Sequence, residues 1–188
     1  MPTHKTPGGK LLSHPEPNRR EQIIDAAYAS IAENGVAGTS HRGVAARCGV
    51  SLGTITYHFS GIDALILEAF SLYARRIADL VRNRLDRPMD RAAAIDAVVD
   101  LIHIDFHADQ TDYNVTYELY ALASRQPALR ELVHDLIGVG LRSLGRHFDE
   151  PQARAINTYI EGASTHLALD TQQQTPEQTR NALQKLAA

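Results

Sequence analysis

Apolar residues recur at the spacing of an α-helix from residue 18 almost to the end of this chain. Beyond residue 61, no segment shows the period-two alternation that is typical of a half-buried strand. A long helical run begins at Ile62, includes Leu85 and stops before Pro88, because proline disfavours a helical residue before it. These patterns predict an all-α fold of about nine helices.

Capping residues predict where these helices begin and end. Asn18 and Glu21 have the spacing of a capping box, in which each side chain binds a free backbone N–H of the first turn. Gly35 should end the first helix, and Gly49 should turn the chain between the second and the third. The expected helices begin at or just after Asn18, Ser40, Ser51, Ser60, Arg91, Asp112, Pro127, Pro151 and Thr175.

The stretch CGVSLGTITYHFSG, residues 48–61, is rich in β-branched and aromatic residues, which are poor helix formers. If Val50, Ile55 and Phe59 face a three-helix core, the opposite face carries short side chains with hydroxyl groups. Such a helix can lie deep in the major groove of DNA, where hydroxyls bind phosphates or base edges. The predicted DNA-binding residues, at the start of the second helix and along the third, are Ser40, His41, Arg42, Ser51, Leu52, Gly53, Thr54, Thr56, Tyr57 and His58.

The charge distribution agrees with this interpretation. The formal net charge of the whole chain is −3, yet residues 1–60 carry six basic and four acidic side chains, whereas residues 61–188 carry 13 basic and 18 acidic ones. The first third is therefore the part expected to meet a polyanion.

The segment TSHRGVAARCGVSLGTITYHFSGIDAL, residues 39–65, resembles the N-terminal signature of the TetR family of transcriptional regulators. Thr56 stands where that signature usually has Tyr, and Ile62 stands where it usually has Lys. The matching positions are Thr39, Arg42, Val44, Ala45, Gly49, Val50, Ser51, Gly53, Thr54, Ile55, His58 and Phe59.

The resemblance implies a helix-turn-helix domain over residues 18–60 and a ligand-binding and dimerisation domain over residues 61–188. It also implies a homodimer that binds an inverted-repeat operator in double-stranded DNA and is released by a small-molecule effector, usually as a repressor. The two last helices should form the dimer interface through Ile156, Tyr159, Ile160, Ala163, Leu167, Leu183 and Leu186.

Tyr113, Tyr117 and Tyr120 fall on one face of one expected helix, and Tyr73 and Phe106 could converge on the same space. Aromatic walls with a few hydroxyls would suit a moderately apolar small molecule, although plain core packing fits the same pattern. The predicted ligand-binding residues are Tyr73, His103, Phe106, His107, Tyr113, Tyr117 and Tyr120.

Asp100, His103 and His107 have a helical spacing that a metal ion could use. The alternative functions are therefore a metal-responsive regulator or a small helical metalloenzyme. The same residues also fit the solvated flank of an amphipathic helix, which is the preferred interpretation. No nucleophile elbow, phosphate loop or His-Glu-x-x-His motif occurs in the chain, so no enzyme activity, cofactor or metal is expected.

Residues 1–17 contain four prolines and two glycines, which predicts a flexible arm. Lys5 and Lys10 in this arm could reach the minor groove, but an idle tail is preferred. The chain has one cysteine, no signal-peptide pattern and no apolar run long enough for a membrane helix. A cytoplasmic location without membrane contact is expected.

Overall fold

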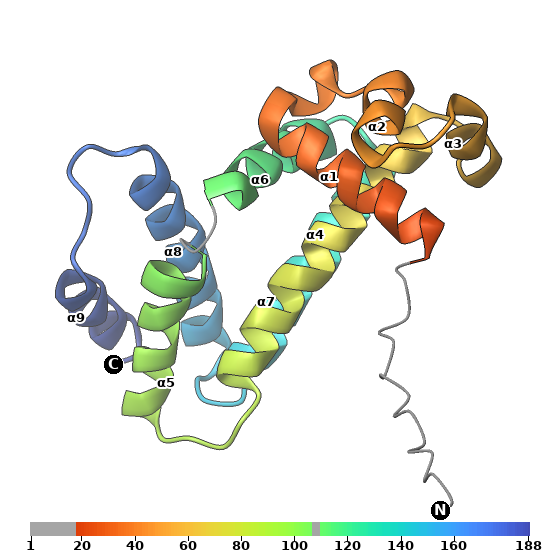
Figure 1. The fold of residues 1–188 in the computed structure, drawn as a ribbon. Coiled ribbons are helices and arrows are strands. Elements are labelled where there is room, and N and C mark those ends of the chain that lie inside the picture. Colours follow the sequence, from red (N-terminus) through yellow and green to blue (C-terminus); the bar gives the residue numbers. More distant parts are fainter. Residues whose placement is uncertain (1–17, 107–109) are drawn as a thin grey trace, which may run out of the picture.

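The structure is a computed structural model that describes residues 18–106 and 110–188. Within these ranges the chain forms nine α-helices and one π-helical segment, η1, with no strand (Figure 1). The predicted flexible arm, residues 1–17, and His107 lie outside the described residues. The elements are α1 (Arg19–Gly38), α2 (His41–Cys48), α3 (Leu52–His58), α4 (Ile62–Leu85), α5 (Arg91–Asp100), η1 (Leu101–Asp105), α6 (Gln110–Ala123), α7 (Pro127–Leu144), α8 (Glu150–Leu169) and α9 (Pro176–Leu186).

The predicted N-caps Asn18, Ser40 and Ser51 are confirmed. The capping box predicted between Asn18 and Glu21 does not form among the described residues, and α1 continues past Gly35 to Gly38. The Asn18 side chain accepts a hydrogen bond from the backbone N–H of the second residue of α1, and Ser40 and Ser51 cap α2 and α3 in a similar way. Gly49 adopts φ 66°, and Gly35 adopts φ 68° inside the last turns of α1. Both values lie in the left-handed region, which glycine adopts at little cost.

Three predicted boundaries are wrong. Ser60 does not cap α4, because the helix starts one residue later with Gly61 at the N-cap and without a side-chain cap. Asp112 lies in the first turn of α6 rather than before it, because α6 already begins at Gln110. One α-helix is expected between the predicted starts at Arg91 and Asp112, but α5 changes into η1 at Leu101, where a wider turn replaces the α-helical one.

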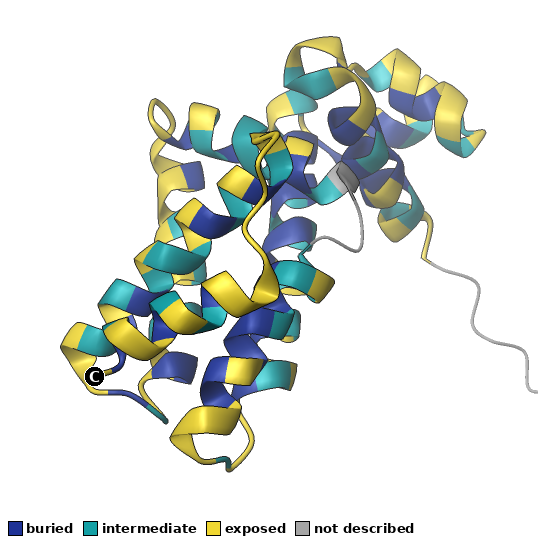
Figure 2. Ribbon diagram, turned by 90° about the vertical axis from the view of Figure 1, so that its left-hand side faces the viewer, coloured by how far each residue is buried: buried dark blue, intermediate teal, exposed yellow. Residues whose placement is uncertain are grey.

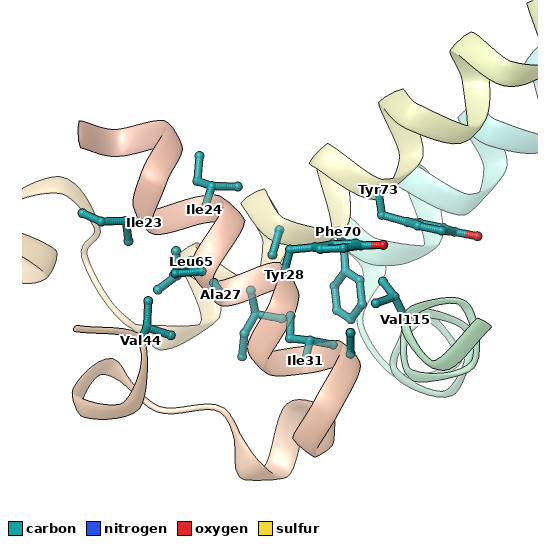
Figure 3. Close-up of a cluster of buried hydrophobic side chains, with 14 of the residues drawn as sticks. Ile23, Ile24, Ala27, Tyr28, Ile31, Val44, Leu65, Phe70, Tyr73 and Val115 are labelled. Carbon is teal, nitrogen blue, oxygen red and sulfur yellow. The ribbon is translucent and has the colours of Figure 1, made fainter. Parts of the chain in front are cut away.

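The helices share two apolar cores. The upper core joins α1, α2 and α3 to the first half of α4, to α6 and to Leu129 at the start of α7. Ile31, Leu65, Phe70 and Val115 are among its side chains (Figure 3). The lower core joins the second half of α4 to α5, η1, the second half of α7, α8 and α9. The long helices α4 and α7 run side by side and contribute to both cores (Figure 1).

Buried residues lie on the helix faces that are turned toward one another, and exposed residues cover the outer faces (Figure 2). None of the described helices is long and apolar enough to cross a membrane.

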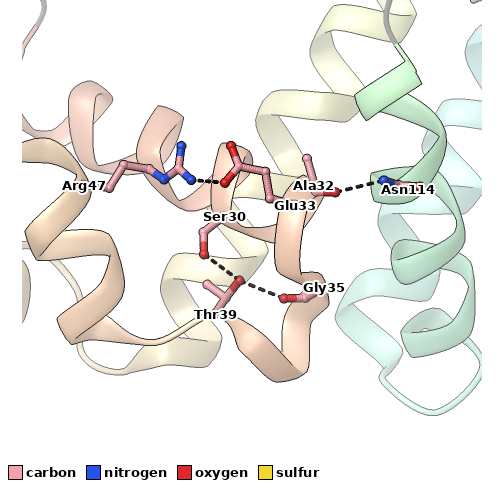
Figure 4. A network of polar contacts seen from close by, with 7 residues as sticks. All are labelled: Ser30, Ala32, Glu33, Gly35, Thr39, Arg47 and Asn114. Carbon is pink, nitrogen blue, oxygen red and sulfur yellow. Dashed lines mark hydrogen bonds and ion pairs between the residues drawn. The ribbon is translucent and has the colours of Figure 1, made fainter.

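A network of polar contacts fixes the end of α1 (Figure 4). The buried Thr39 hydroxyl donates to the Gly35 carbonyl oxygen at 2.9 Å and lies 3.1 Å from the Ser30 hydroxyl. Arg47 of α2 forms an ion pair with Glu33 of α1. These contacts hold the turn at Gly35 and helix α2 against α1.

Candidate nucleic-acid interface and ligand pocket

Helix α3 has one buried and one exposed side. Ile55 has no accessible surface and Phe59, just after the helix, is also buried, so this side anchors α3 to the upper core. On the opposite side, Tyr57 is 84% exposed and Leu52 is 47% exposed. Two large apolar side chains left in solvent on a seven-residue helix indicate a surface shaped for contact with another molecule.

Some hydroxyls of α3 already have partners within the helix. The Ser51 and Thr54 hydroxyls lie 2.9 Å apart, and Ser51 also accepts the Thr54 backbone N–H. Thr56 donates to the Gly53 carbonyl oxygen at 3.1 Å. Thr56 uses its hydroxyl only as a donor here, so its oxygen can still accept a hydrogen bond from outside.

The start of α2 carries a cation that no described residue pairs with. Arg42 is exposed and forms no ion pair with any described residue, whereas Arg47 on the same helix is paired with Glu33. His41 is half-buried, and its Nε2 atom is buried without a hydrogen-bond partner in the described part of the chain. Arg42 is therefore the group in this turn that is placed to meet a phosphate or a guanine edge.

The ten predicted DNA-binding residues all lie on α2, on α3 or at the caps that precede them. His41, Thr54 and His58 are half-buried. The other seven are exposed: Ser40, Arg42, Ser51, Leu52, Gly53, Thr56 and Tyr57.

A pocket lies between α4, η1, α6, α7 and α8, far along the chain from α3. The space open to the centre of a water-sized sphere is about 90 Å³. A single water needs roughly 10–15 Å³ of such space. The cavity can therefore hold more than a single water. Five of the predicted ligand-binding residues line it, namely Tyr73, Phe106, Tyr113, Tyr117 and Tyr120.

Sequence reasoning missed the polar side of this pocket. Its walls also contain Asp112, Thr116, Asn157, Glu161, Ser164 and Thr165. The four on α8 recur at helical spacing, which is a signal that the sequence does contain. It was overlooked because α8 was interpreted as an interface helix.

Glu161 and Tyr120 form the main polar contact of the pocket. The Tyr120 hydroxyl donates to Glu161 Oε2 at 2.8 Å. Burial raises the pKa of Glu161 above its ordinary value, although the hydrogen bond from Tyr120 opposes this. Glu161 has considerable accessible surface as a whole residue, and part of that surface is the cavity wall itself. Burial also raises the pKa of Tyr120, and the neighbouring Glu161 raises it further.

A second polar chain joins α4 to α6. The Thr116 hydroxyl donates to the Asp112 carbonyl oxygen at 2.8 Å, so the 2.5 Å contact between Tyr73 and Thr116 uses the Tyr73 proton. Burial raises the pKa of Tyr73 to about 12 and that of Tyr113 to about 12. These phenols stay neutral at physiological pH and can act as hydrogen-bond donors.

The structure contradicts the predicted role of His103. Its Nε2 lies 2.8 Å from the Thr179 hydroxyl of α9, and the residue is not part of the pocket wall. His107 lies outside the described residues. Asp100 pairs with Arg84, which also binds Asp105, and no group of three possible metal ligands occurs among the described residues. The metal-site alternative is therefore not favoured.

The predicted dimer residues divide into two groups. Ile156 and Leu183 have no accessible surface in the single chain, and Ala163 and Leu167 are also buried in its lower core. For Ile156 and Leu183 the prediction of a partner contact is wrong, because each is enclosed by its own chain. Tyr159, Ile160 and Leu186 keep some accessible surface, and Ile160 also lines the pocket.

A helix-turn-helix head with an exposed reading face, joined to a helical body that encloses a pocket, defines a class of ligand-responsive transcriptional regulators. Two family models match the chain: bacterial regulatory proteins, tetR family, over residues 23–69, and tetracyclin repressor-like, C-terminal domain, over residues 89–188. The chain belongs to the TetR family and is a transcriptional regulator rather than an enzyme.

Individual relatives agree with this assignment. PksA, an HTH-type transcriptional regulator of Bacillus subtilis (strain 168), is 24% identical over 173 residues, covering 86% of this chain and 83% of that protein. SCO7518 of Streptomyces coelicolor A3(2) has a TM-score of 0.84 and 41% identity, covering 92% of this chain and 99% of that one. The multidrug binding protein EbrR, solved with ethidium, has a TM-score of 0.77 and 31% identity, covering 91% and 99%.

Proposed function

We propose that the protein is a dimeric repressor that binds an inverted-repeat operator and is released from it by a small molecule held in the pocket. The observation that carries this proposal is the position of α6. One side of this helix forms much of the pocket wall, and the other side packs on α1 of the DNA-binding head.

Hydrogen bonds join α6 to α1 from Asp112 to Glu118. Near its middle, the Asn114 side chain donates to the Ala32 carbonyl oxygen at 2.9 Å (Figure 4), and Glu118 accepts the Val36 backbone N–H at 3.2 Å. In its first turn, Asp112 accepts a hydrogen bond from Tyr28 of α1. A ligand that moves α6 would therefore move the head.

Release by a ligand requires different affinities for two arrangements of the protein. A ligand that favours one position of α6 changes the angle between the head and the body. In a dimer this alters the separation of the two recognition helices, which must be about 34–36 Å apart to read successive major grooves.

The outer side of α8 supports the proposed dimer. Leu169 is 70% exposed, and open space surrounds the position of a Cβ at Gly162. Tyr159 and Leu186, which keep accessible surface, would join them in a contact between two copies. The small residue lets two helices approach closely, as α8 and α9 of both subunits would in a four-helix arrangement.

The solved structure of EbrR with ethidium supports a small molecule as the effector, because that relative of 31% identity holds an organic ligand. We expect the pocket of this chain, with its aromatic and hydroxyl-bearing wall, to bind an organic small molecule as well.

The first experiment is selection from random DNA duplexes at near-physiological salt, with sequencing of the bound fraction. Enrichment of an inverted repeat would support the proposal and identify the operator. The Tyr57→Ala variant, which loses the most exposed side chain of α3 without disturbing the core, should lose the enrichment. Weak binding that falls steeply with salt and enriches no sequence would contradict it.

A further inference from the structure

The proposed function leaves the chemical class of the effector open, and the following inference rests on that function. We propose that the pocket selects an organic cation, with an apolar or aromatic body held among the tyrosines and its positive charge directed at Glu161.

The charges around the cavity are of one sign. Glu161 of α8 and Asp112 of α6 both line it, and no Lys, Arg or His occurs among its described lining residues. α4, η1 and α7 contribute no charged group to the described wall. Two carboxylates without a basic counter-ion among the described wall residues create a negative potential in the cavity.

Of the two carboxylates, Glu161 is the one available to a ligand. Asp112 already accepts the hydroxyl of Tyr28, which ties it to α1. Glu161 is held through Oε2 by Tyr120, and its Oε1 atom has no hydrogen-bond partner among the described residues. Burial raises the pKa of Glu161, so an ionised carboxylate at this position lacks a counter-charge that a bound cation would supply.

The other walls suit the body of such a cation. Tyr73, Tyr117 and Tyr120 belong to the same cavity as Phe106, and the face of an aromatic ring attracts a cation. The remaining walls are mainly aliphatic, including Ile77, and these would pack against an apolar body. A ligand with a negative charge would meet the field of both carboxylates and is disfavoured.

One buried hydroxyl also points to a ligand. Ser164 lines the cavity, and its Oγ atom is buried without a hydrogen-bond partner among the described residues. Buried polar atoms are nearly always paired in native proteins, with protein groups, water or ligands. Ser164 follows Glu161 by one helical turn on α8, so both side chains can contact the same bound molecule.

The test compares two probes that differ by one methyl group and one charge, N-methylacridinium and acridine. Fluorescence titrations of the full-length protein are made without DNA, at a pH above neutrality where acridine is uncharged. The variants are Glu161→Gln, which keeps the shape and an acceptor for Tyr120, and Glu177→Gln, a matched control at an exposed position in the first turn of α9. Thermal unfolding of each variant confirms that it is folded.

We expect the wild type and Glu177→Gln to bind N-methylacridinium at least roughly tenfold more tightly than acridine. Glu161→Gln should lose roughly 10- to 100-fold in affinity for the cation and should keep its affinity for acridine within about twofold. Equal affinity of the wild type for both probes, no binding of the cation, or no effect of Glu161→Gln would each overturn the proposal.

These outcomes are independent of the proposed function. The duplex selection tests operator binding with no probe present, whereas the titrations test the pocket with no DNA present. If an operator is enriched and the pocket binds both probes equally, the repressor proposal is supported and only the proposal of a cationic ligand is overturned.

Discussion

Tyr28 of α1 donates a hydrogen bond from its hydroxyl to the carboxylate of Asp112 on α6. Asp112 lines the pocket, whereas Tyr28 belongs to the upper core (Figure 3). The Arg76 guanidinium lies over the Tyr28 ring at 4.7 Å from its centroid. One contact thus joins the pocket wall directly to the helix that supports the recognition surface.

The Tyr28→Phe substitution removes the hydroxyl that donates to the half-buried carboxylate of Asp112. We expect the free energy of unfolding to fall by about 1–3 kcal/mol, as measured by urea denaturation. Tyr159→Phe is a matched control, because the Tyr159 hydroxyl binds Gln174 at an exposed position and should contribute less than about 0.5 kcal/mol. Equal urea midpoints for the two variants would show that the contact with Asp112 contributes nothing.

Two glycines of the head should respond in opposite ways to alanine. Gly49 has φ 66° and open space around the position of a Cβ, so Gly49→Ala should cost about 1–2 kcal/mol through backbone strain alone. At Gly53 an added Cβ meets only Ser51 Oγ at 3.7 Å and lies within α3, so Gly53→Ala should keep or raise stability by up to about 1 kcal/mol.

The Gly53→Ala substitution should also change the affinity for DNA. Gly53→Ala should bind the selected operator less tightly than wild type, because its methyl group enters the face proposed to lie in the groove. A stable Gly53→Ala protein with unchanged operator affinity would remove Gly53 from that face.

Arg42→Ala should weaken operator binding by about 1–3 kcal/mol, because it removes an exposed cation at the start of α2 that pairs with no residue the structure describes. Arg87→Ala removes the same charge from the loop after α4 and serves as the matched control. Fluorescence anisotropy with the selected duplex measures both. If the two variants lose the same affinity, the effect comes from overall charge rather than from a contact made by Arg42.

The stability of the protein should depend on Glu161 in a defined pH range. Burial makes the folded-state pKa of Glu161 higher than its unfolded-state pKa, so the folded state binds the proton more tightly. The contribution of Glu161 to the free energy of unfolding therefore falls as pH rises from the ordinary glutamate pKa through the raised one.

Urea denaturation over a series of pH values checks this. Relative to wild type, Glu161→Gln should gain stability as pH rises through that range and then stay constant. Burial also raises the pKa of Asp112. Asp112 should therefore lower the free energy of unfolding of both proteins as pH rises, and this decrease should persist in the variant. Parallel curves for the two proteins would contradict the assignment.

Much of the fold could be predicted from local signals. The caps at Asn18, Ser40 and Ser51 and the capping box at Thr175 act within one helical turn, so their effect is visible in the sequence. Gly61 shows the limit of such reasoning. The adjacent serine is the better cap by residue type, but α4 begins at Ile62 with Gly61 at its N-cap.

The pocket depended on non-local contacts and was therefore predicted only in part. The spacing of Tyr113, Tyr117 and Tyr120 placed them on one face of α6, and that face does line the cavity. Nothing in local spacing paired Glu161 with Tyr120, since 41 residues separate them. Likewise, periodicity put Ile156 on an apolar stripe of α8 without telling whether its own chain or a second copy covers that stripe.

The upper core has a consequence for how such regulators can be recombined. Its side chains come from the head and also from Phe70 of α4, Val115 of α6 and Leu129 of α7. A chimera joined at residue 60 would confront the head of one protein with packing partners chosen for another. Exchange of DNA specificity between family members should therefore succeed when only the exposed residues of α3 are grafted. All residues of the upper core should then come from the recipient protein.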